Sequence, residues 1–178
     1  GIVQAHEGAI RVESHPGKGT SVQLYFPARQ QATAAVAPKA VPGPRGQGQR
    51  ILYLDDEVFL VDLMRTLFQR AGYEVSGHTS PEKALQAIVE GRDRPDLIIT
   101  DLNMPTLSGL QFADLVQKHL PDVPIALISG HVTEDLVGEA RRAGVRQVLY
   151  KPLKTQDLLG HVARLLADRA AAKSASGG

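Results

Sequence analysis

The sequence predicts an α/β domain built on an all-parallel sheet over residues 50–169. Strand-like and helix-like patterns alternate five times along this stretch. The strand-like run at 97–100, LIIT, is apolar or β-branched throughout, which is typical of a strand covered on both faces. Because parallel strands are joined by right-handed crossovers, five such units place helices on both faces of the sheet.

The boundaries of the elements follow from apolar spacing and from capping residues. The predicted strands are 51–54, 73–77, 97–100, 124–128 and 145–150. The first and third helices are predicted over 58–70 and 107–119. The second, fourth and fifth helices each follow a residue that favours the N-cap: Ser80, Thr133 and Thr155. Glycines are expected to stop the first, second and fourth helices: Gly72, Gly91 and Gly144. The common solution for such a chain is a doubly wound, flavodoxin-like sheet of strand order 2-1-3-4-5 with five helices.

Residues 1–28 predict a separate, smaller piece of structure. A helix end closed by Gly8 leads into two strands, 9–14 and 20–26, which are joined by a turn at 15–19. A helix end and one hairpin cannot bury a core alone. We therefore expect this piece to be the remnant of a larger domain.

Composition limits what the rest of the chain does. Residues 29–49, rich in Ala, Pro, Gly and Gln, predict a flexible linker, and 170–178 predict a disordered tail. The formal net charge of +1 and the lack of aromatic residues among the linker's basic residues argue against nucleic-acid binding. The chain has no cysteine, which excludes disulfides and thiolate catalysis. No apolar run approaches the ~20 residues of a membrane helix, so we expect no membrane contact.

Polar side chains follow four of the predicted strands. Asp55 and Asp56 follow the first strand, Asp101 the third, Ser129 the fourth and Lys151 the fifth. In the predicted strand order these ends are neighbours, so the five side chains should converge at one edge of the sheet. Each residue alone has an ordinary explanation as an N-cap, a turn residue or a solvated lysine. Their joint occurrence at the correct strand ends favours a functional site.

The residue types at this edge point to phosphoryl chemistry. Three carboxylates together repel one another and need a cation, and oxygen ligands without His or Cys select Mg²⁺ or Mn²⁺. The charge of Lys151 and the hydroxyl of Ser129 suit a transferring phosphoryl group. Asp101 is then the natural nucleophile, because a carboxylate can form an aspartyl-phosphate.

Residues 50–167 resemble the receiver (response-regulator) domain of bacterial two-component signalling. Its marks are an acidic pair after strand one, an Asp followed by x-x-Met-Pro and a later Gly, a Ser or Thr after strand four, and a Lys-Pro after strand five. In this sequence they are Asp55-Asp56, Asp101 with Met104-Pro105 and Gly109, Ser129, and Lys151-Pro152.

The resemblance implies a phosphorelay function. Asp101 would accept a phosphoryl group from a phosphohistidine on a kinase or a histidine phosphotransfer domain, and Ser129 and Lys151 would bind the phosphoryl oxygens. The domain would catalyse its own phosphotransfer and signal to a downstream protein through the face of the fourth helix and fifth strand. Mg²⁺ would be held by Asp56, Asp101 and the main-chain carbonyl of Asn103, with Asp55 acting through water.

Two features bear on how such a domain switches. The position three before the lysine, usually aromatic in the family, is Val148, and the aromatic Tyr150 stands next to Lys151 instead. Conventional aromatic switching is therefore not expected. Asn103 and His131 occupy the positions that tune dephosphorylation in the family, although His131 alone is better explained as a loop residue.

Residues 1–28 resemble the end of a histidine-kinase ATP-binding domain, through Gly-Ala-Ile-Arg-Val-Glu-Ser and the Pro-Gly-Lys-Gly-Thr turn. The upstream nucleotide-binding motifs are not in this sequence, so we expect no ATP binding or kinase activity from the piece itself. The order kinase end, linker, receiver implies a bacterial hybrid sensor kinase and a cytoplasmic receiver, with membrane anchoring of the parent kinase left open.

Three alternatives remain at this stage. A receiver-like interaction scaffold that works without phosphorylation is favoured only by Val148. A phosphatase of the haloacid dehalogenase type also places an Asp at a strand end, but it needs a second acid where this chain has Asn103. A dinucleotide enzyme is disfavoured because no Gly-x-Gly-x-x-Gly follows the first strand.

Overall fold

The computed structural model describes residues 2–5, 7–27 and 43–176, and it divides the chain into two compact units, 1–39 and 40–178. The N-terminal unit contains α1 (Ile2–Ala5) and a ribbon of two antiparallel strands. Residues 29–42 of the predicted linker, and residue 28 before it, lie outside the described residues. Within the described part of the chain, no helix is both long and apolar enough to cross a bilayer.

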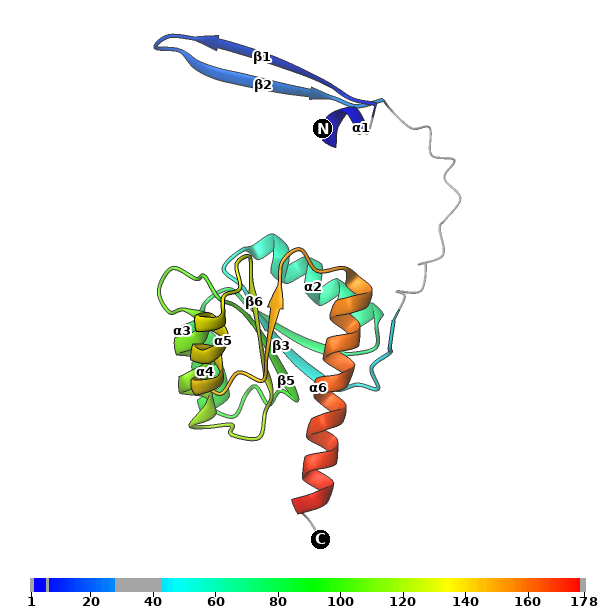
Figure 1. Cartoon of the computed structure of the whole chain (residues 1–178), viewed down its shortest axis with the longest axis vertical. Helices are drawn as coiled ribbons and strands as arrows, with labels where there is room; N and C mark the ends of the chain where they lie inside the picture. The colour runs from blue at the N-terminus through cyan, green and yellow to red at the C-terminus, as the bar shows by residue number, and fades with distance from the viewer. Residues whose placement is uncertain (1, 6, 28–42, 177–178) are drawn as a thin grey trace. The chain divides into compact units, whose positions relative to one another are not determined.

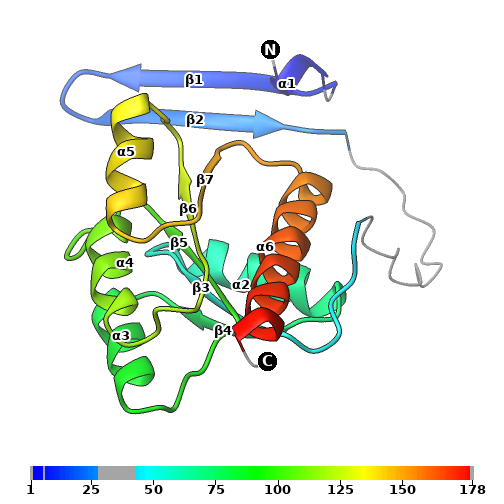
Figure 2. The same cartoon turned by 60° about the horizontal axis from the view of Figure 1, so that its bottom comes forward.

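The ribbon of the N-terminal unit is the predicted hairpin. Strands β1 (Ala9–His15) and β2 (Gly19–Tyr25) pair along their whole length (Figures 1 and 2). Apolar residues pair with one another across the strands, Ile10 with Leu24 and Val12 with Val22. All four of these side chains are more than half exposed.

The end of α1 differs from the prediction. Glu7, not Gly8, adopts the left-handed conformation, with φ of 55°. The Gly8 amide donates to the Val3 carbonyl at 2.9 Å and the Glu7 amide to Gln4 at 3.0 Å, which is the paired closure of a Schellman motif. Gly8 is needed for close packing, because a Cβ there would lie 2.7 Å from the carbonyl oxygen of Tyr25.

The C-terminal unit confirms the predicted doubly wound fold. Its strands are β3 (Arg50–Leu54), β4 (Glu74–His78), β5 (Leu97–Asp101), β6 (Ile125–Ser129) and β7 (Gln147–Tyr150). Its helices are α2 (Val58–Arg70), α3 (Pro81–Val89), α4 (Gly109–Gln117), α5 (Glu134–Arg142) and α6 (Thr155–Ser176). All strand pairs are parallel, in the order β4-β3-β5-β6-β7, which is the predicted 2-1-3-4-5.

The sheet separates two apolar layers. Figure 1 shows α2 and α6 on one face and α3, α4 and α5 on the other. The first layer packs Phe68 of α2 and Leu159 of α6 against the sheet, and the second packs Ile88 of α3 and Phe112 of α4. Every residue of β5 and β6 is buried, because both strands are covered on both faces.

Local signals explain most helix ends. Ser80 and Thr133 cap α3 and α5 with their side chains, as predicted. The glycines expected to stop helices adopt positive φ: Gly72, Gly91 and Gly144. Two starts were wrong. Ser108 caps α4, which therefore begins later than residue 107, and Lys154, whose carbonyl accepts from the Leu158 amide, precedes α6 in place of Thr155.

The predictions of a flexible linker before this unit and of a disordered tail after it are wrong for the described residues 43–49 and 170–176. Residues 43–49 hydrogen bond to the domain, since the amides of Gly46 and Gly48 donate to the carbonyls of Ala71 and Gly72. Helix α6 continues to Ser176, so the predicted tail is helical over 170–176. An alanine-rich sequence has the highest helix propensity, and it prolongs the preceding helix.

Candidate functional site

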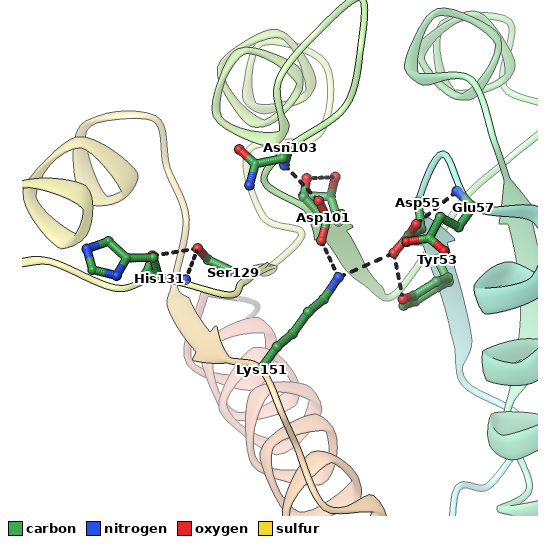
Figure 3. Close-up of polar contacts among 9 residues, drawn as sticks. Tyr53, Asp55, Glu57, Asp101, Asn103, Ser129, His131 and Lys151 are labelled. Atoms are coloured by element: carbon green, nitrogen blue, oxygen red, sulfur yellow. Dashed lines mark hydrogen bonds and ion pairs between the residues drawn. The ribbon is translucent and has the colours of Figure 1, made fainter. Parts of the chain in front are cut away.

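The carboxyl ends of β3, β5 and β7 bring two carboxylates and an ammonium group together. Asp101 ends β5, Asp55 follows β3, and Lys151 follows β7. Lys151 Nζ lies 2.6 Å from Asp101 Oδ1 and 3.7 Å from Asp55 Oδ2. Figure 3 shows the lysine reaching between the two acids. The sequence correctly placed these three residues at one edge of the sheet.

Burial and neighbouring charge set the ionisation of the acids and the lysine. Burial raises the pKa of Asp55, although the Glu57 amide, which donates to its Oδ1 at 3.0 Å, and Lys151 oppose this shift. Burial also opposes the charge of Lys151, but its hydrogen bond to Asp101 and the negative charge there raise the pKa of the lysine overall. Lys151 therefore stays charged and compensates the paired acids.

The loop after β5 holds Asp101 from the backbone. The Asn103 amide donates to Asp101 Oδ2 at 2.7 Å, so both carboxylate oxygens have a partner. Gly109, at the start of α4, packs directly against this turn. A Cβ at Gly109 would lie 2.2 Å from the Asp101 carbonyl oxygen and 2.7 Å from Leu127 Cδ1. The later glycine of the motif is thus required by close packing.

Ser129 ends β6, as predicted, but its side chain contacts the loop that follows this strand and not Asp101 or Lys151. Its hydroxyl donates to the His131 carbonyl at 2.6 Å and accepts from the His131 amide at 3.1 Å. Figure 3 places this pair apart from the Asp101–Lys151 contact. The imidazole of His131 is exposed, and only its backbone contributes here.

The predicted metal ligands are only partly assembled in this conformation. Asp56 is exposed, and within the described ranges no hydrogen bond or ion pair joins it to Asp55, Asp101 or Lys151. No group of three carboxylate or imidazole side chains in the described part of the chain lies close enough to hold an ion. The donor set still fits Mg²⁺, because it offers carboxylate and carbonyl oxygens and Lys151 already takes the place of a cation between two acids.

Sequence reasoning missed Tyr53. Its side chain is 2% exposed, and its hydroxyl donates to Asp55 Oδ2 at 3.3 Å. Burial and the charge of Asp55 raise the pKa of Tyr53, so it keeps its proton and remains a donor. The position of Tyr53 could have indicated this contact, because a residue two positions before Asp55 in a strand lies on the same face. An aromatic residue in a buried strand is, however, usually explained as part of the core.

Comparison with known proteins agrees with this geometry. The family model "Response regulator receiver domain" matches residues 51–163. The chemotaxis protein CheY of Thermotoga maritima is 30% identical over 108 residues, which are 60% of this chain and 88% of that protein. The sensor protein EvgS of Escherichia coli K12 is 26% identical over 166 residues, 92% of this chain and 14% of that protein.

Two further matches extend the comparison. The two-component response regulator ARR10 of Arabidopsis thaliana is 30% identical over 111 residues, 62% of this chain. The chain spans only 20% of that protein's length. A receiver domain protein from Clostridium thermocellum superposes with a TM-score of 0.64 at 28% identity, covering 69% of this chain and 98% of that structure. With its fold, its converging strand ends and these matches, the chain belongs to the response regulator receiver family.

Proposed function

We propose that this receiver domain accepts a phosphoryl group on Asp101 from a phosphohistidine in a two-component phosphorelay. The observation that carries the proposal is the contact of 2.6 Å between Lys151 Nζ and Asp101 Oδ1 at the end of β5, beside the buried Asp55. A charged lysine on a strand-end carboxylate is placed to stabilise the negative charge that arrives with the phosphoryl group.

The bonds that change in the proposed transfer belong to Asp101 and to the donor. An Asp101 oxygen attacks phosphorus, and the P–N bond breaks with its electron pair going to the ring nitrogen of the donor histidine. From a ring protonated at its other nitrogen, the histidine leaves as neutral imidazole. Lys151 then moves its contact from the carboxylate to the phosphoryl oxygens. Asn103 keeps the loop in register through its backbone amide.

Mg²⁺ would supply additional positive charge to the phosphoryl oxygens. Its ligands would be Asp56, Asp101 and the main-chain carbonyl of Asn103, with Asp55 through water. Asp56 is exposed and Asp55 is buried, and the two acids follow each other directly after β3. Lys151 has to shift when the ion binds, because it contacts both acids.

The output of the domain would follow from Ser129. A phosphoryl group adds about −1.5 to −2 charge at Asp101 and attracts a hydroxyl donor. Ser129 would exchange the His131 carbonyl for a phosphoryl oxygen, which changes the loop that leads into α5. A partner protein that binds the surface of α5 and β7 would then bind the two states with different affinity. Tyr150, at the end of β7, is 57% exposed and lies on that surface.

The proposed context is a hybrid sensor histidine kinase. The match to the sensor protein EvgS covers 92% of this chain, so it extends well before residue 51. The exposed apolar pairs of the β1–β2 ribbon suit a strand pair whose covering core belongs to an ATP-binding domain. The receiver would then work on the cytoplasmic side, where its phosphoryl donor acts.

The test is intact mass after incubation with acetyl phosphate, with and without Mg²⁺. The expected result is one phosphoryl adduct that needs the metal, is lost in Asp101→Asn and persists in Asp114→Asn, which changes an exposed carboxylate on α4. A folded protein without any adduct would refute the phosphoacceptor role and favour the phosphorylation-independent scaffold. Transfer from a phosphorylated histidine phosphotransfer domain then tests the relay itself.

A further inference from the structure

We propose that a groove between β7 and the C-terminal half of α6 binds a small organic anion carrying phosphate or carboxylate groups. The groove has a volume of about 650 Å³. It lies at the amino edge of the sheet, because Pro124 precedes β6 and Gln147 begins β7, so it is opposite the Asp101 edge. The inference is independent of the phosphoacceptor role.

Position along α6 explains how the groove forms. Its α6 residues form three adjacent pairs, each four residues after the last, so they share one stripe of the helix: 164 and 165, 168 and 169, and 172 and 173. Figure 1 shows α6 continuing past the end of the sheet. The C-terminal half of α6 therefore supplies one wall, and its last two lining residues, Ala172 and Lys173, belong to the part of the helix that the sequence did not predict.

The charged side chains that line the groove give it an excess of positive charge. They are Arg146, Arg164, Arg169 and Lys173, with Asp122 and Asp168. Arg169 also pairs through Nη1 with Asp96, outside the groove. The whole chain carries only +1, so positive charge is concentrated here.

Arg164 is held in place by neutral groups. Its Nη2 donates to Gln147 Oε1 at 3.0 Å and to His161 Nδ1 at 2.9 Å, and Gln147 Nε2 donates to the same Nδ1 at 2.8 Å. His161 Nδ1 accepts both bonds, which places the ring proton on Nε2. Arg65 and Arg92, in contrast, pair with carboxylates on the surface. Arg164 is thus oriented without losing its charge to a partner.

A second guanidinium in the groove has an unused donor. The side chain of Arg169 is 13% exposed, and its Nε is buried without an acceptor among the described residues. Because this Nε is closed to solvent, a ligand in the groove would act on Arg169 through the charge of the guanidinium, and the apolar side chain of Leu165 would contact the body of the ligand.

Size and charge favour a small molecule over a polymer. Clefts of about 300–1,000 Å³ are typical of small-ligand sites. The carboxylates of Asp122 and Asp168 interrupt the basic surface and would repel an extended polyanion such as a nucleic acid.

The test is a titration of the full chain with inorganic phosphate and, separately, with citrate, followed by ¹H–¹⁵N NMR without Mg²⁺. We expect saturable shifts of amides at 146–147 and 164–173. Arg164→Gln should weaken binding by about tenfold, which is the size expected for one charge-assisted hydrogen bond. Ala172→Glu, which adds a negative charge on the exposed helix surface, should abolish it.

The control is Arg141→Gln, which removes an exposed arginine on α5 and should leave binding unchanged. Saturation by phosphate alone or by citrate alone supports the site and assigns its chemistry, and saturation by both supports a general anion site. Shifts confined to the Asp101 edge, shifts that never saturate, or equal weakening by Arg141→Gln and Arg164→Gln would overturn the proposal.

Discussion

At the scale of a single residue, Tyr53 connects the carboxylate of Asp55 to the apolar core. Its ring packs 6.5 Å from that of Phe68, and its hydroxyl donates to Asp55. The hydroxyl favours the ionised form of a carboxylate whose pKa burial raises. Tyr53 therefore orients Asp55 and favours its ionised form.

Tyr53→Phe should weaken Mg²⁺ binding by about tenfold, because groups that orient metal-binding carboxylates typically contribute this much. The pH at which binding appears should also rise, since Asp55 loses a donor that stabilises its charge. Isothermal titration calorimetry from pH 5 to 8 measures both effects. Tyr73→Phe is the matched control, because Tyr73 is also buried and also packs on Phe68. Equal affinities for the two variants would contradict the role of Tyr53.

Gly109 illustrates how tightly the β5 turn is packed. Gly109→Ala should destabilise the protein by about 1–3 kcal/mol, the usual cost of overpacking, because the Asp101 carbonyl is backbone and cannot yield easily. Urea denaturation measures the change. Gly160→Ala on α6 meets nothing within 4 Å and should stabilise by about 0.5–1 kcal/mol. A neutral Gly109→Ala would mean that the turn shifts freely.

At the scale of elements, a polar cluster fastens the segment after α3 to the edge strand β4. Asp93 accepts hydrogen bonds from Ser76 and from His78, the latter at 2.9 Å. Burial tends to raise the pKa of Asp93, but these two bonds outweigh it and lower the pKa. A carboxyl whose folded pKa is depressed contributes stability above its unfolded value of about 3.9, and this stability is lost as pH falls through the folded value.

Asp93→Asn should therefore cost about 1–2 kcal/mol at pH 7, and its difference from the natural chain should shrink as pH falls below 4. Urea denaturation at pH 7, 4 and 3 measures this. Asp114→Asn, which removes an exposed carboxylate paired with Lys118, should change stability far less. A difference that stays constant down to pH 3 would show that the lowered pKa of Asp93 is not its cause.

Elements with strong local signals were predictable. The N-caps at Ser80 and Thr133 and the apolar runs of β5 and β6 depend on near neighbours or on burial from both sides, and both are visible in sequence. The contact of Lys151 with Asp55 joins β7 to β3, and the orientation of Ser129 depends on a loop carbonyl. Residue spacing indicates which strand ends meet, but it carries no information about which rotamer a side chain adopts.

For the whole molecule, residues 43–49 belong to the folded domain and not to the linker. The Gln49 carbonyl accepts from the Glu74 amide at 3.0 Å, in addition to the bonds from Gly46 and Gly48. A Pro- and Gly-rich composition predicted flexibility here because it shows no apolar period. Backbone hydrogen bonds leave no such pattern, so this segment was not predictable.

A chain beginning at Gly43 should unfold at the same temperature as the full chain's receiver domain. A chain beginning at Arg50 loses these three backbone hydrogen bonds and should be less stable by about 1–3 kcal/mol. Differential scanning calorimetry compares the three chains. Equal stability of the two shortened chains would show that residues 43–49 contribute nothing to the domain.

The hydrogen bond between Tyr53 and Asp55 also gives the domain an optical reporter. The chain has four tyrosines and no tryptophan, so tyrosine emission is not masked. Among these tyrosines, all of which lie in the described part of the chain, Tyr53 is the one that donates to Asp55. A cation or phosphoryl group that changes the contacts of Asp55 should alter the ultraviolet absorbance and emission of the Tyr53 ring. Binding at the Asp101 edge could then be followed by tyrosine spectroscopy of the natural chain, without an added label.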